Sequence, residues 1–145
     1  MSLDSYIDEL VAQKKVFLSS LKETTSFNNF LMSLPWDITG TRIDFSKTNF
    51  NYKKLNYSEL IDHEVYSCLL QSKIGTFSHI LILVDSGEAC IVTDIEYGLL
   101  HLDELLAGSP GVCFVCGANP NDEKLNPDYE SLLMYDDGRY LVAVV

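Results

Sequence analysis

Residues 79–97 read HILILVDSGEACIVTDIEY and contain two β-rich runs joined by the tripeptide SGE. A short connection with glycine between two such runs is typical of a β-hairpin. Successive side chains of a strand point to opposite faces of the sheet. We therefore expect the second strand to continue to Tyr97, with Asp94 and Glu96 together on one of its faces.

Three further segments of the second half extend this pattern. Residues 131–135 (SLLMY) and 140–145 (YLVAVV) flank the sequence DDGR, in which Asp-Gly is a strong turn signal for a hairpin. Residues 112–116 (VCFVC) form another apolar run that we interpret as a strand. Residues 99–108 (LLHLDELLAG) carry leucines at helical spacing and predict a short helix that ends at its glycine. We expect the last strand to lie inside the sheet.

The first half of the chain has a mixed pattern. Apolar residues follow a helical period over residues 2–23, and residues 27–34 resume it after an interruption at 24–26. Proline follows at position 35 and predicts the end of the helix. Beyond it we expect an edge strand at 42–46 (RIDFS), a loop or irregular edge at 47–56, a helical turn at 58–64, and at 65–72 (VYSCLLQS) a short segment in which strand is favoured over helix.

These expectations define a fold class. A chain of 145 residues has the length of a single domain, so we assign residues 1–145 to one unit. Short hairpin loops imply antiparallel pairing. The order of elements therefore predicts an α+β fold, in which N-terminal helices pack on a curved, mainly antiparallel sheet with one short inserted helix.

Cys113 and Cys116 form a C-x-x-C sequence, a spacing that occurs in zinc sites and in redox pairs. On a strand, residues three apart point to opposite faces, and the residues after Cys116 are typical of a turn, whereas a redox pair opens a helix. The sequence has no second C-x-x-C, and Cys68 and Cys90 are isolated in other apolar runs. We therefore expect buried, reduced thiols, no bound metal and no cofactor.

Charge is distributed unevenly along the chain. Residues 1–84 contain nine acidic and eight basic residues, whereas residues 85–145 contain twelve acidic and two basic ones, so the second part holds nearly all of the net charge of −11. An excess of carboxylates repels phosphate backbones and attracts cationic proteins. This pattern disfavours direct binding of nucleic acid.

The acidic residues of the second part are concentrated in four pairs. A generic soluble surface mixes both signs of charge, so we predict that these pairs form a dedicated recognition surface, although a merely solvated surface is the alternative. A tyrosine beside the last pair would be an efficient interface anchor. No run matches the calcium-binding loop pattern. The predicted surface comprises Asp94, Glu96, Asp103, Glu104, Asp122, Glu123, Tyr135, Asp136 and Asp137.

Local motifs for catalysis are missing from the sequence. It contains no G-x-S-x-G, P-loop or G-x-G-x-x-G, and the histidines at positions 63, 79 and 101 lack metal-site spacing. We therefore expect no enzymatic activity and name no catalytic residue, while a small enzyme or metal-binding domain assembled from distant residues is a further alternative. No apolar run reaches about 18 residues, so we expect no membrane span. The chain opens with acidic residues, and its four cysteines lack the density of a secreted disulfide scaffold, so we expect a cytoplasmic location.

A short chain with one acidic half and no catalytic motif resembles the immunity proteins of bacterial contact-dependent growth inhibition systems, in particular the enterobacterial type paired with a toxin that cleaves ribosomal RNA. The resemblance covers the whole chain and rests on its overall character. It implies an inhibitor that forms a 1:1 heterodimer with a basic toxin domain, an RNase, and that binds neither nucleic acid nor membrane. An acidic adaptor or regulatory domain for another basic protein is the alternative.

Overall fold

The computed structural model describes residues 3–13, 15–56, 62–85, 87–106, 111–122, 124–136 and 140–145. Their elements follow one another as α1 (Leu3–Ala12), β1 (Phe17–Leu18), α2 (Leu21–Met32), η1 (Phe45–Lys47), β2 (Tyr52–Asn56), α3 (Asp62–Leu70), η3 (Lys73–Thr76), β3 (His79–Leu83), β4 (Ile91–Asp94), α4 (Ile95–Leu100), α5 (Leu102–Leu106), β5 (Val112–Ala118), β6 (Pro127–Asp136) and β7 (Tyr140–Val144).

The strands form a single sheet in the order β1-β4-β3-β5-β6-β7-β2, and each neighbouring pair is antiparallel. Two predicted hairpins, β3–β4 and β6–β7, are confirmed, and β7 lies inside the sheet between β6 and β2. The strands β1 and β2 form the two edges. The predicted α+β class is therefore confirmed.

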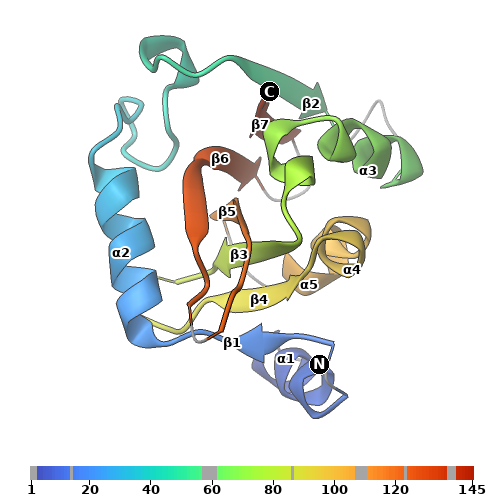
Figure 1. Ribbon diagram of the computed structural model, residues 1–145. Coiled ribbons are helices and arrows are strands. Elements are labelled where there is room, and N and C mark those ends of the chain that lie inside the picture. Colours follow the sequence, from blue (N-terminus) through green and yellow to red (C-terminus); the bar gives the residue numbers. More distant parts are fainter. Residues whose placement is uncertain are drawn as a thin grey trace.

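Helices cover both faces of this sheet (Figure 1). One apolar core contains residues of α1, α3, α4 and α5. The other contains Phe27 and Leu31 of α2, together with Ile43 and Phe45 from the segment that follows it. The two N-terminal helices therefore lie on opposite faces. Among the described helices, none is long and apolar enough to cross a bilayer.

The two cysteines of the C-x-x-C sequence confirm the expected strand geometry. Both are buried in β5, but Cys113 belongs to the core beneath α1 and Cys116 to the core beneath α2. Burial raises the pKa of the Cys116 thiol well above its usual value. The two sulfurs thus face different environments across the sheet.

Two predicted segments near the start of the chain differ from the structure. Residues 42–46 are no strand, because the Asp44 carboxylate accepts a hydrogen bond from the Ser46 N–H at 3.1 Å and starts the 3-10 turn η1. Residues 24–26 lie within α2, and the interruption between the two helices comes earlier, at β1. The region expected as a loop or irregular edge at 47–56 ends in the edge strand β2, which pairs with β7 along its whole length.

The segment expected to favour strand at 65–72 is largely helical, because α3 runs to Leu70. Val65 and Leu69 are buried one helical turn apart, which is the spacing of a helix face. The Ser72 hydroxyl donates to the Cys68 carbonyl at 3.0 Å just beyond the helix. A short apolar run does not by itself distinguish a strand from a buried helix.

Candidate partner-binding surface

Asp94 and Glu96 do not share a strand face, because β4 ends at Asp94 and α4 follows at once. The Asp94 carboxylate accepts a hydrogen bond from the Tyr97 N–H at 3.0 Å, so this residue is the N-cap of the helix. Glu96 occupies the first turn, where a negative charge is favoured by the helix dipole. Both residues are exposed. The acidic capping pattern was the signal in the sequence for a helix here.

Close packing fixes α4 on the sheet and thereby positions these two carboxylates. A Cβ atom at Gly98 would lie 2.4 Å from Cδ1 of Ile80 in β3 and 2.7 Å from Cγ2 of Thr93 in β4. Only a residue without a side chain permits this approach. Packing on β3 and β4 therefore sets the position from which the helix presents Glu96.

Asp103 and Glu104 are exposed on α5, the helix that follows α4. The Tyr135 hydroxyl donates to Oδ1 of Asp103 at 2.6 Å, and Nδ1 of His101 lies 3.4 Å from Oε2 of Glu104. Tyr135 itself is only 2% exposed and belongs to the core. The prediction that Tyr135 is an interface anchor is therefore corrected. Its ring is buried in the core, and its hydroxyl holds the Asp103 carboxylate.

Asp122 is exposed in the connection between β5 and β6 and has a positive φ of 56°. The Ser78 N–H donates to Oδ1 of Asn119 at 2.9 Å, which ties the start of this connection to the chain before β3. In the sheet, His79 is paired with both Ala118 and Asp94. Asp122 and Asp94 therefore lie toward the same end of the sheet. The predicted residue Glu123 is outside the described part of the chain.

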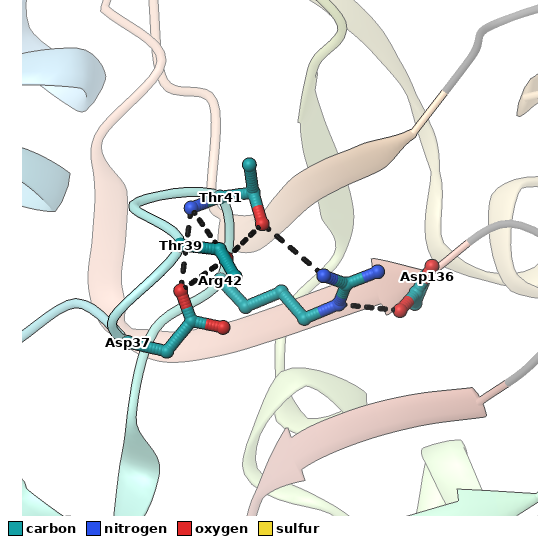
Figure 2. A network of polar contacts seen from close by, with 5 residues as sticks. All are labelled: Asp37, Thr39, Thr41, Arg42 and Asp136. Atoms are coloured by element: carbon teal, nitrogen blue, oxygen red, sulfur yellow. Dashed lines mark hydrogen bonds and ion pairs between the residues drawn. The ribbon is translucent and has the colours of Figure 1, made fainter.

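Asp136 lies at the opposite end of the sheet and is buried, with 3% of its surface exposed. The Arg42 Nε atom donates to its Oδ2 at 2.7 Å, as Figure 2 shows. This hydrogen-bonded ion pair is the main reason that the pKa of the Arg42 guanidinium is raised. The prediction of Asp136 as a partner-binding residue is wrong in this respect, because its charge is already compensated within the chain. Asp137 falls outside the described residues.

A small polar network holds Arg42 in this position (Figure 2). Its Nη1 donates to the Thr41 hydroxyl at 3.1 Å, and that hydroxyl lies 2.7 Å from the Thr39 hydroxyl. Thr39 in turn donates to the Asp37 carboxylate at 2.6 Å, which lowers the pKa of that carboxyl. The network fastens the turn between α2 and η1 to the end of β6.

Four acidic residues of the second half were not among the predicted site residues. Asp85 and Glu88 flank the β3–β4 turn and are exposed, Asp128 is half-buried, and Glu130 is exposed with its Oε2 3.9 Å from Nζ of Lys73. Asp128 and Glu130 have the same spacing as Asp94 and Glu96, so the spacing of acids along the sequence does not by itself separate the predicted residues from these four.

We use the term acidic surface for the exposed residues Asp94, Glu96, Asp103, Glu104 and Asp122. Asp103 bonds to Tyr135, the neighbour of Asp136 in β6, so it lies nearer the other end of the sheet than Asp94 and Asp122 do. Within the ranges that the structure describes, no group of three or more His, Cys, Asp or Glu side chains could hold a metal ion. The chain matches no protein-family model, no curated protein and no solved structure.

Proposed function

We propose that this chain is an immunity-type inhibitor that binds a basic toxin domain through its acidic surface, as a 1:1 heterodimer in the cytoplasm. The observation that supports this most is the exposure of Glu96, Asp103 and Glu104 on two consecutive helices. Lysine and arginine side chains of a nuclease hold the phosphates of its substrate. Carboxylates that pair with these cations would block the approach of RNA.

The net charge of the second half also favours rapid recognition. Opposite charges on two proteins steer their encounter and raise the association rate, and salt weakens this effect. We therefore expect the association rate with the toxin to fall steeply between low and high ionic strength. Stopped-flow fluorescence would measure it, and a rate independent of salt would contradict the role of the acidic surface.

Co-expression with the toxic C-terminal fragment encoded by the neighbouring open reading frame tests the proposal directly. We expect the wild-type chain to rescue growth and to copurify with the fragment. The double variant Glu96→Lys and Glu104→Lys should weaken the complex by about tenfold or more, because two favourable charge pairs become repulsive. Isothermal titration calorimetry would measure the affinities.

A matched control reverses charges elsewhere. Lys53 and Lys54 are exposed on the edge strand β2, remote in sequence from the acidic surface. The double variant Lys53→Glu and Lys54→Glu should bind the toxin at least as tightly as the wild type does, because it adds negative charge and leaves the acidic surface intact. Binding only to a different basic protein would instead support the adaptor function, and release of product from a substrate panel would overturn both.

A further inference from the structure

A groove of about 340 Å³ lies beside the edge strand β1, on the face of the sheet that α1 covers. Its apolar part comes from the first helix, the edge strand and the β3–β4 hairpin, and two carboxylates complete it. The lining residues are Ile7, Asp8, Leu18, Val84, Glu88, Ala89 and Ile91. This combination of an apolar wall with acids suits a side chain that has an aliphatic stem and a cationic end.

The edge strand next to the groove exposes apolar side chains. Phe17 is 43% and Leu18 is 49% exposed. The Ser19 N–H donates to the Cys90 carbonyl at 2.9 Å, and hydrogen-bonded positions alternate along an antiparallel pair. The backbone N–H and C=O of Leu18 therefore point away from β4, toward the open side of the sheet. Exposed edges of this kind can pair with an extended segment of another protein.

Among the described residues that line the groove at the β1 edge, the charged ones are carboxylates, whereas Lys15 and Lys22 lie outside this lining and the β2 edge carries lysines. Asp8 and Glu88 lie at the β1 edge, and both are exposed. At the β2 edge the exposed charged residues are Lys53 and Lys54, and Nζ of Lys54 lies 4.1 Å from the centre of the Tyr140 ring. A cationic segment therefore finds complementary charge in the groove beside β1 and repulsion at β2.

We propose that the groove binds an arginine side chain from an extended, basic and apolar segment of the toxin, laid along β1. This assignment of the occupant rests on the proposed function. The arginine stem packs on Leu18 and Ile91, and its planar guanidinium pairs with Asp8 and Glu88. Apolar neighbours of the arginine cover Phe17. Arginine is a frequent anchor of protein interfaces, and its planar guanidinium matches carboxylates better than a lysine ammonium does.

A synthetic peptide tests the groove without the toxin. Acetyl-Val-Arg-Val-Arg-Val-amide is titrated into the isotope-labelled chain, and methyl NMR shifts are followed. We expect shifts at Ile7, Leu18, Val84 and Ile91, and about tenfold weaker binding when citrulline, which is uncharged and similar in shape, replaces arginine. Equal binding of both peptides would overturn the proposal, as would shifts confined to α4 and α5.

Two pairs of conservative variants localise the binding. Asp8→Asn with Glu88→Gln should weaken peptide binding about tenfold, whereas Glu96→Gln with Glu104→Gln should leave it unchanged. All four residues are exposed, so both double variants should keep the wild-type unfolding midpoint. A similar loss of peptide affinity in both double variants would indicate nonspecific attraction to the acidic chain. It would overturn the proposal that the groove is the binding site.

The same groove variants in the toxin assay separate the two proposals. If the peptide binds the groove but the toxin fragment does not bind the wild-type chain, the proposed function fails and the arginine site stands. If Asp8→Asn with Glu88→Gln retains full affinity for the toxin, the groove is no part of the interface and the proposed function stands. Loss of toxin affinity by about tenfold supports both.

Discussion

Asp94 and Asp136 both end a strand of the same sheet, but their side chains meet opposite conditions. Asp94 ends β4, is exposed, and caps the helix that follows. Asp136 ends β6, is buried, and pairs with Arg42 from a segment 94 residues earlier in the chain. An acidic residue at the end of a strand is therefore available to a partner only if no distant segment of the chain covers it.

The physical difference lies in solvation. Burial of a carboxylate is costly unless hydrogen bonds or an opposite charge compensate it, and Arg42 supplies both. At the other end of the sheet, Asp94 is exposed, and its carboxylate accepts a hydrogen bond from the Tyr97 N–H. One acid thus contributes to the fold, and the other contributes charge to the surface.

The largest effect on stability is expected from Asp136→Ala. The substitution removes a charged hydrogen bond and leaves Arg42 without its partner, so the free energy of unfolding should fall by about 1.5–3 kcal/mol. Urea denaturation followed by circular dichroism would measure the change. For comparison, Glu96→Ala should remain within about 0.5 kcal/mol of the wild type. Equal losses of unfolding free energy in the two variants would contradict the difference between the buried and the exposed acid.

A smaller effect is expected from Asp94→Ala, which removes the N-cap of α4. The cost should be about 1 kcal/mol, because the Tyr97 N–H loses its acceptor. Asp94→Ser is the matched control, since serine also caps a helix but carries no charge. If serine and alanine destabilise the protein equally, the contribution of Asp94 is electrostatic and not a cap.

The smallest effect concerns the titration of the half-buried Asp37. Its pKa is below the usual value of 3.8 in the folded chain, chiefly because the Thr39 hydroxyl donates to the carboxylate. The stability that it contributes is present above pH 3.8 and is lost as the pH falls through the lower, folded value. Backbone NMR shifts of Thr39 and Thr41 should therefore titrate below pH 3.8. In Asp37→Asn this transition should disappear, and its persistence would assign it to another group.

The hairpins could be predicted because their signals are local. Glycine in the β3–β4 turn and the apolar runs beside it are sufficient to indicate antiparallel strands. The opposite orientation of Cys113 and Cys116 also followed from strand parity alone. Alternation alone predicts that β4 continues to Tyr97, three residues too far, because Asp94 caps a helix and thereby ends the strand.

Other elements depend on partners that are distant in sequence. The strand β2 exposes most of its residues and buries only Leu55 within its span, so no apolar alternation marks it, and its pairing with β7 makes it a strand. The inclusion of Thr24 in α2 also involves a partner that is distant in sequence. Its hydroxyl donates to the Glu88 carbonyl at 2.6 Å, a contact across 64 residues that no local pattern indicates.

The sequence by itself determined the α+β class, the two hairpins and the concentration of negative charge in the second half, because periodicity, turn chemistry and composition are properties of neighbouring residues. Only the tertiary structure decided which acids face solvent. It buried Tyr135 beneath Asp103 and enclosed Asp136 with Arg42, while Glu96 remained exposed on α4. Burial depends on which distant segments pack together, and a carboxylate has the same charge in the sequence whether or not the fold compensates it.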